Sequence, residues 1–508
     1  MRLPALLHDA VGVTIAASEI ISFPAARQIA DILKEAMKQE FNGAVEPVMW
    51  PDNTRPTSSG QESLCLTYFL HPDDLELNEP SCIEVFGDLN VEALQKAFNQ
   101  LLQRHEVLRC GFKRENGVIV SFLDPTATTV PMTILKEPIA SDEEIKALLT
   151  KAMRYQFDLA SPPYMRVTVS PVGPRRHIVM FVMHHIAMDG WSLAPIWIDV
   201  MAFYKAIVTG NPPQVRDLRV QYSDFAAWER KQLEPGTEKY EKMALYWKKQ
   251  LQHATPVVQL PEDYARQVHP TEHLPLVDGN AVISIGQLDA LKELASSLKV
   301  SLYALCLAAF RLMLCEFGAT DDVLIASSFS MRPPGTENLV GYFLRMLLLR
   351  NRLEESDSFS TLVVREMSTL TAAIEHSILP LQEVLKVSNL PRAPGRTPSW
   401  QAAITWDEHE WMDPSAALGE DSPLDMAPYI NFDLADAPTD VILGLEPSPE
   451  GLKLRLGCDG NLFKQETVDR MFRRLVQIFE NAAAAPYQLL KSTQLLAESE
   501  RDEALESK

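Results

Sequence analysis

Long apolar runs, positive charge and metal-binding patterns are all scarce in this sequence of 508 residues. No stretch approaches the roughly 18 apolar residues that cross a membrane, so neither a membrane segment nor a membrane partner is expected. Lys and Arg number 47 against 68 Asp and Glu, which gives a net charge of −21. This balance argues against a nucleic-acid partner, because such partners call for basic patches.

Cysteine is also scarce, and its placement bears on the cellular compartment. The six cysteines are scattered and sit mostly in apolar runs: Cys65, Cys82, Cys110, Cys306, Cys315 and Cys458. We interpret them as reduced core residues, with a catalytic thiol as the less favoured alternative. The opening residues, Met1 to Pro4, lack the apolar core of a secretory signal. A cytoplasmic location is therefore expected.

Length and composition predict a folded protein with more than one lobe. A chain of 508 residues exceeds the size of one ordinary hydrophobic core, so two or more lobes are expected. An apolar content of 46% and a charged content of 23% are typical of globular proteins.

The most informative stretch runs from Ile178 to Ser192. Six apolar residues predict a buried strand, which delivers His184 and His185 to a place with little water. Imidazole is the usual side chain for accepting a proton near pH 7. Asp189 and Gly190 then predict a turn, in which Asp189 holds the shape and Gly190 leaves the space beside it free of side chain.

Two plainer interpretations of these histidines compete with a catalytic role. A histidine after an apolar strand is often a satisfied core residue. Adjacent side chains on a strand point to opposite faces, so His184 and His185 suit one metal ion poorly. No His-Glu-x-x-His or Cys-x-x-Cys pattern occurs elsewhere, so no metal site is predicted.

Periodicity predicts further elements before and after this stretch. Residues 1–35 are expected to form a small helical piece, and residues 36–61 a linker rich in turn-forming residues. In the part that follows we expect a helix over Val91–His105, a strand over Tyr164–Val169 that pairs with the His184 strand, a helix over Leu193–Ile207 that Ser192 could cap, and a long helical region from Gln221 to near His253.

A second globular half is predicted from Pro256 onwards. Its expected elements are a helix over Ser301–Phe317, a strand over Asp322–Ser328, a hairpin between residues 440 and 463, and a helix from Lys464 to about Ala483. The acidic residues 407–436 are predicted to form a loop or mobile latch. The charged tail after Leu490 is expected to fray.

Several of these stretches resemble the condensation domains of nonribosomal peptide synthetases. Residues His184 to Gly190 have the family's His-His-x-x-x-Asp-Gly pattern. Arg104 to Phe112 resembles its Arg-His-Glu-x-Leu-Arg-x-x-Phe motif, and Tyr222 to Trp228 its Tyr-x-Asp-Phe-Ala-x-Trp motif. The sequence is identified as a member of this family from about Glu62 to Leu490.

The opening motif and three later motifs are degraded. Gly341 to Arg350 is similar to Gly-x-Phe-Val-Asn-Thr-x-x-x-Arg, but Arg345 and Met346 stand where Asn and Thr are expected. The stretches that begin at His376 and Arg396 match only loosely. A guanidinium in place of a small amide beside the expected tunnel is a large chemical change, so Arg345 is expected to affect substrate scope and turnover.

The resemblance implies an α/β fold of two chloramphenicol-acetyltransferase-like lobes, which form a V around a central tunnel. The lobes would comprise residues 62–255 and 256–490. The stretch from Gly12 to Leu33 resembles the last third of a carrier protein without its modified Ser, which implies a carrier remnant or docking piece at 1–35. Residues 491–508 resemble the linker to an adenylation domain. Together these ends favour a piece of a larger synthetase.

The resemblance also implies an acyltransferase that forms amide bonds. An upstream donor carrier would present a thioester on its phosphopantetheine arm, and the amine of a downstream acceptor carrier or a small amine would attack it. The chain itself would hold no cofactor. His185 would take a proton from the amine or hold the amine in position, while His184 supports the strand end.

The remaining residues of the motif are expected to act through structure. Asp189 would pair with an arginine of the second lobe, for which Arg332 is the candidate. Gly190 would keep the tunnel open beside His185, with Trp191 and Ser192 in support.

Three alternative functions stay open. An ester-forming acyltransferase of the same fold would use an alcohol and acyl-coenzyme A, but the Tyr222 to Trp228 motif and the carrier-like start favour the synthetase. An epimerisation domain commonly lacks the Gly-Trp-Ser that follows Asp189. A docking or gating module would bind carriers without turnover, with Arg345 blocking the tunnel.

Overall fold

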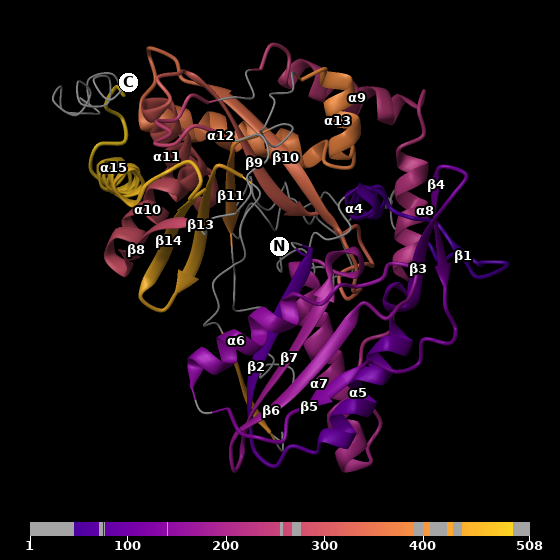
Figure 1. Ribbon diagram of the computed structural model, residues 1–508. Helices are drawn as coiled ribbons and strands as arrows, with labels where there is room; N and C mark the ends of the chain where they lie inside the picture. Colours follow the sequence, from indigo (N-terminus) through magenta and orange to yellow (C-terminus); the bar gives the residue numbers. More distant parts are fainter. Residues whose placement is uncertain are drawn as a thin grey trace.

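The computed structural model describes residues 45–70, 75, 77–139, 141–254, 258–266, 276–390, 400–406, 424–429 and 439–490. The predictions for residues 1–35, for the Arg396 motif and for the tail from residue 491 lie outside these ranges. Figure 1 shows two lobes, with the first half of the chain in the lower lobe and most of the second half in the upper one.

The first lobe is built on a five-stranded sheet in the order β12-β2-β7-β6-β5. Its strands are β2 (Asn78–Phe86), β5 (Met132–Ile134), β6 (Met165–Gly173), β7 (Arg176–His184) and β12 (Asp425–Pro428). A small sheet beside it has the order β1-β4-β3, formed by β1 (Thr54–Arg55), β3 (Cys110–Glu115) and β4 (Val118–Leu123). Its helices are α4 (Ser59–Leu70), α5 (Val91–Arg104), α6 (Asp142–Met153), α7 (Leu193–Thr209) and α8 (Tyr222–Gln232).

The central part of β7, residues 178–183, is apolar because both faces of its sheet are covered. Val179 and Phe181 belong to the large core that includes residues of α5 and α7. Ile178 and Met180 belong to a smaller cluster with residues of α6. A strand buried on both faces is expected to lack alternation. The predicted buried strand and its pairing with β6 are therefore confirmed, and the structure shows that the pairing is antiparallel.

The second lobe is built on a six-stranded mixed sheet in the order β10-β9-β11-β13-β14-β8. Its strands are β8 (Val277–Ser284), β9 (Asp322–Ser330), β10 (Leu344–Arg352), β11 (Ala402–Trp406), β13 (Val441–Ser448) and β14 (Gly451–Cys458). Its helices are α9 (Glu238–Gln250), α10 (Ile285–Leu298), α11 (Leu302–Phe317), α12 (Phe359–Glu375), α13 (Leu381–Ser388) and α15 (Gln465–Ala484). The predicted hairpin is the β13–β14 pair.

The helical region predicted from Gln221 to near His253 consists of two helices, α8 and α9, with a break between them. Pro235 lacks an amide hydrogen, and Gly236 has a positive φ of 85°, so the helix cannot continue. After the break, Trp247 of α9 packs in the core of the second lobe. The chain thus passes to the second lobe before the predicted boundary at residue 255.

Two segments predicted to be irregular form part of the first lobe. Thr54–Arg55 pairs with β4, and α4 begins at Ser59, so the predicted linker at 36–61 contributes regular structure. Within the predicted loop at 407–436, β12 pairs antiparallel with β2. Strand β12 therefore joins the sheet of the lower lobe although its neighbours in sequence belong to the upper lobe (Figure 1). Its Met426 is buried in the first-lobe core, which accounts for the pairing.

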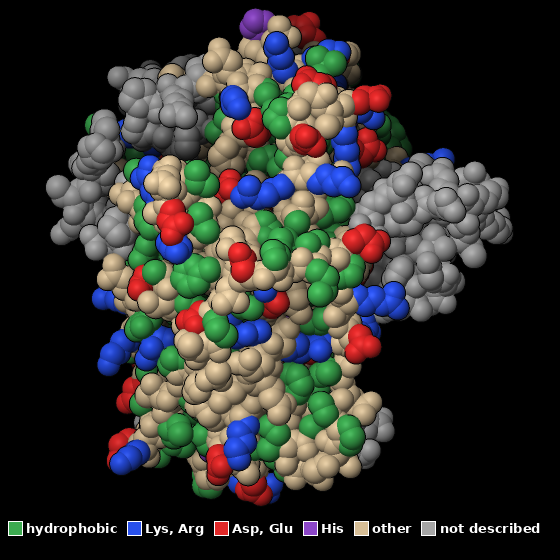
Figure 2. Space-filling model, turned by 90° about the vertical axis from the view of Figure 1, so that its right-hand side faces the viewer, with side chains coloured by type: hydrophobic (Ala, Val, Ile, Leu, Met, Phe, Trp, Pro, Cys, Tyr) green, Lys and Arg blue, Asp and Glu red, His purple; other side chains and the backbone are tan. Residues whose placement is uncertain are grey.

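Two features bear on the partners expected from composition. On the face shown in Figure 2, Lys and Arg side chains are interspersed with Asp and Glu. The stretch Gly190–Thr209, which includes α7, is long and apolar enough to cross a membrane by length and composition. Half of its apolar window is buried, because α7 packs against α5 in the core of the first lobe.

Candidate functional site

His184 ends β7 and is enclosed by aromatic rings. Its Nδ1 accepts a hydrogen bond from the backbone N of Ile186 at 3.0 Å, and only 5% of the residue is exposed. The rings of Tyr68, Phe157 and Tyr164 lie around it. Burial, followed by the charge of the neighbouring His185, lowers the pKa of His184 to about 3, so this imidazole is neutral near pH 7. Its contacts are those of a residue that shapes the end of the strand.

His185 begins a single turn, His185–Ala187, and stays partly accessible, with 17% of its side chain exposed. Its Nδ1 lies 3.1 Å from the backbone O of Met188. Its Nε2 lies 2.7 Å from Oε1 of Glu79, near the start of β2. Burial opposes the charged ring, but the charge and hydrogen bond of Glu79 raise the pKa of His185 to about 9. Sequence reasoning missed Glu79, which comes next to His185 through strand pairing.

Asp189 is fully buried and joins the two lobes. Its Oδ1 accepts from the backbone N of Ser192 at 3.0 Å and from Nη2 of Arg332 at 2.7 Å. Its Oδ2 accepts from the backbone N of Phe343 at 3.0 Å and from Oγ of Ser330 at 3.4 Å. The lone pairs of the carboxylate are thus occupied by donors from both lobes. The structure brings Asp189 and Arg332 together, as the sequence predicted.

Ser192 does not cap α7, and this expectation is wrong. The residue ends a turn, Gly190–Ser192, that runs straight into the helix, and its own backbone is already helical (φ −73°, ψ −18°). Its Oγ lies 2.8 Å from Oδ1 of Asp189 and accepts from the backbone N of Gly341 at 3.1 Å. Ser192 therefore links the histidine turn to the second lobe. Gly190 and Trp191, in the same turn, are half-buried.

The motifs that begin at Arg104 and Tyr222 both contact one segment of the second lobe, residues 340–343. Nε2 of His105 lies 2.8 Å from Oδ2 of Asp199, and its Nδ1 accepts from the backbone N of Val340 at 3.4 Å. The hydroxyl of Tyr222 donates to the backbone O of Tyr342 at 2.6 Å. The motifs of the first lobe therefore converge on residues 340–343, and Tyr342 in turn lies edge-on to the ring of His185.

Gly341 is required where this segment meets Tyr222, and we expect Gly341→Ala to destabilise the protein. A Cβ at this position would lie 2.0 Å from Cδ2 of Tyr222, whose hydroxyl is fixed by the backbone of Tyr342. Overpacking of this kind costs about 1–3 kcal/mol, so the free energy of unfolding in urea should fall by about that amount. Gly286→Ala is the matched control, since its Cβ would meet nothing within 4 Å. A Gly341→Ala protein as stable as the control would contradict this packing.

Arg345 forms a buried ion pair, so it does not project freely between the lobes. It lies on β10 with 4% of its side chain exposed, and it pairs with Glu229 of α8, which is fully buried. Glu229 also accepts from the backbone N of Ser59 at 2.7 Å and from its Oγ at 2.8 Å. Burial lowers the pKa of Arg345 to about 10, and the guanidinium remains charged near pH 7.

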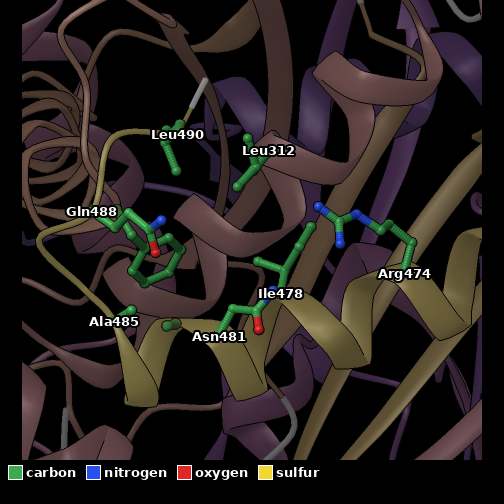
Figure 3. Close-up of a pocket in the computed structure, with 9 residues that line it drawn as sticks. Leu312, Arg474, Ile478, Asn481, Ala485, Gln488 and Leu490 are labelled. Carbon is green, nitrogen blue, oxygen red and sulfur yellow. The ribbon is translucent and has the colours of Figure 1, made fainter. Parts of the chain in front are cut away.

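The cysteines are buried, and the described cavity belongs to the second lobe. All six cysteines are buried and free of disulfides, and burial raises the pKa of Cys65 to about 12, so its thiol stays protonated. Among the residues that the structure describes, no group of three metal-ligating side chains is found. A cavity of about 100 Å³ lies in the second lobe between Leu312, Ile478 and Leu490 (Figure 3).

Comparison with known proteins places this geometry in a family. The family model "Condensation domain" matches residues 52–505. Tyrocidine synthase 2 of Brevibacillus parabrevis is 25% identical over 511 residues, which cover 99% of this chain and 13% of that protein. Surfactin synthase subunit 1 of Bacillus subtilis (strain 168) is 26% identical over 504 residues, which cover 98% of this chain and 13% of that protein. The chain thus spans only a small part of these relatives.

Solved structures have the same fold. The X-domain from teicoplanin biosynthesis superposes with a TM-score of 0.77 at 22% identity, over 89% of this chain and all of that one. The first condensation domain of the calcium-dependent antibiotic synthetase superposes with a TM-score of 0.67 at 17% identity, over 87% of this chain and 99% of that one. The predicted α/β fold of two chloramphenicol-acetyltransferase-like lobes is confirmed.

Proposed function

Because the chain belongs to the condensation-domain family, we propose that it transfers an acyl or peptidyl group from a carrier-bound thioester to an amine. The observation that carries the proposal is the setting of His185. Its ring stays partly exposed at the junction of the lobes, while the neighbouring His184 and Asp189 are buried and engaged in structural contacts. Of the three ionisable side chains of the motif, His185 is thus the one that a substrate can reach.

The substrates are proposed to arrive on partner proteins. An upstream carrier presents the donor thioester on its phosphopantetheine arm, and a downstream carrier or a small amine supplies the acceptor. The amine nitrogen attacks the thioester carbonyl, the carbon–sulfur bond breaks, and the proton lost by the amine leaves with the thiolate. His185 takes that proton in passing or orients the amine by a hydrogen bond. Holding both reactants at one place supplies much of the rate.

The remaining members of the motif serve this reaction by fixing the turn. Asp189 and Ser192 bind the backbone of the second lobe, so the position of His185 depends on both lobes. The gating alternative depended on an Arg345 side chain that blocks the tunnel. Arg345 is instead buried in an ion pair with Glu229, which argues against the gating alternative.

A transfer assay by intact-protein mass spectrometry tests the proposal. The protein is mixed with an acyl-loaded donor carrier and an aminoacyl-loaded acceptor carrier, and we expect the acceptor to gain the mass of the acyl group. A donor carrier without its phosphopantetheine arm is the control. Transfer from acyl-coenzyme A to an alcohol, with none between carriers, would instead support the ester-forming alternative. Carrier binding without any transfer would support a gating module.

A further inference from the structure

The carboxylate of Glu79 contacts Nε2 of His185, the ring nitrogen that the proposed reaction requires to be free for the substrate amine. Glu79 lies on β2 opposite Met183 of β7, next to the pair formed by Asn78 and His184. Its Oε1 is 2.7 Å from Nε2 of His185, and 37% of its side chain is exposed. The contact therefore lies at the accessible edge of the imidazole.

Hydrogen-bond geometry fixes the protonation state of this ring. Nδ1 faces the backbone O of Met188, which can only accept a hydrogen bond. Nε2 faces the carboxylate of Glu79, which also accepts. Both ring nitrogens of His185 therefore donate, and the ring is an imidazolium. In this arrangement it has no lone pair with which to take a proton from an amine.

The other groups around His185 leave Glu79 as the charge that decides its state. His184 of β7 is neutral, and Gln61 of α4, which donates to the backbone O of Ile186, carries no charge. From the second lobe, burial raises the pKa of Tyr342 to about 12, so its hydroxyl stays protonated.

The remaining charged neighbours form a pair of their own. The carboxylate of Asp189 is bound by the guanidinium of Arg332 at 2.7 Å. The charge of Asp189 also favours the imidazolium, but as a smaller contribution than that of Glu79.

We propose that Glu79 is a positioning residue of the reaction centre, which holds the His185 ring doubly protonated and turned toward β2 until an acceptor takes its place. This inference rests on the proposed function, since it concerns the resting state of the same histidine. When the pair opens, Nε2 is exposed to solvent and loses its proton to water, which leaves a neutral imidazole. That imidazole can then accept the proton of the amine.

The inference predicts an alkaline pH profile that depends on Glu79. Transfer requires the neutral imidazole, so the rate of the wild-type protein should rise with pH up to about pH 9, the pKa of His185. Glu79→Gln keeps a hydrogen-bonding side chain and removes the charge, so the midpoint of the acid limb should fall by at least about one pH unit. At pH 7 this means about tenfold more neutral His185, with a correspondingly faster single turnover. Glu79→Asp should restore part of the alkaline shift.

Ring titration by NMR gives a reading that does not depend on turnover. The protein is labelled at its 11 histidines, and His185→Ala identifies the signal of interest. We expect the midpoint of His185 near pH 9 in the wild type and at least about one unit lower in Glu79→Gln. Glu84→Gln is the matched control, because Glu84 carries the same charge on the same strand and pairs with Arg176. Along β2, Glu84 lies about 17 Å from Glu79 at about 3.4 Å per residue.

Equal NMR midpoints in the wild type and Glu79→Gln would overturn the inference. So would a rate profile that does not shift with the NMR midpoint. A shifted midpoint without acyl transfer in any variant would establish the ion pair and overturn the proposed function instead. The two failures are therefore distinguishable.

Discussion

Replacing Asp189 by Asn is expected to lower the free energy of unfolding by about 3–5 kcal/mol, because the substitution leaves the largely buried Arg332 guanidinium without a carboxylate partner. The carboxylate is fully buried, and 11% of the Arg332 side chain is exposed. An amide nitrogen in place of either oxygen would also face a donor, since Oδ1 accepts from Ser192 and Oδ2 from Phe343. The loss therefore includes hydrogen bonds as well as the ion pair.

Urea denaturation of three variants separates these contributions. Arg332→Met removes the buried charge, so the double variant of Asp189→Asn and Arg332→Met should be more stable than the sum of the single effects predicts. Acyl transfer should fall in every variant, because each one removes part of the contact that holds the turn of His185 against the second lobe. An Asp189→Asn protein with wild-type stability would contradict the account of the lobe junction.

Arg345→Asn is expected to destabilise the protein by about 3–5 kcal/mol, although it restores the residue that the family pattern favours. The substitution leaves Glu229 fully buried without its cation, and only the two hydrogen bonds from Ser59 remain. The effect on stability should therefore exceed any gain in transfer. Urea denaturation and the carrier assay measure the two effects on one preparation.

The matched control for Arg345→Asn is its double variant with Glu229→Gln. A neutral amide at position 229 no longer needs a cation, so the double variant should recover much of the lost stability. A stable Arg345→Asn protein that transfers acyl groups faster than the wild type would contradict the predicted loss of stability. It would mean that the guanidinium obstructs the substrate.

Local patterns predicted the elements that position the site. The apolar run before His184 predicted β7, the helical spacing of Val91–His105 predicted α5, and the Asp-Gly pair predicted the turn. These predictions hold because burial on both faces of a strand, or on one face of a helix, requires a pattern of apolar residues that is visible within about ten to fifteen neighbouring residues. The Arg332 contact was predicted from the family resemblance rather than from spacing.

Contacts between distant segments could not be predicted in this way. Glu79 reaches His185 across a strand pair, and Arg345 meets Glu229 across 116 positions of sequence. Strand β12 has only four residues, too few for alternation to identify it, and its partner β2 lies far earlier in the chain. Ser192 was misassigned as a cap because sequence does not show that its turn continues directly into α7.

Single-turnover acyl transfer by His185→Ala, compared with the wild type, tests the central claim most directly. General acid–base and positioning contributions of a histidine are worth about 10²–10⁴-fold, so the rate should fall at least about 100-fold in a protein that is still folded by circular dichroism. His177→Ala, at the other end of β7, is the control and should keep the wild-type rate. If His185→Ala transfers acyl groups at the wild-type rate, His185 is not the residue on which the reaction depends.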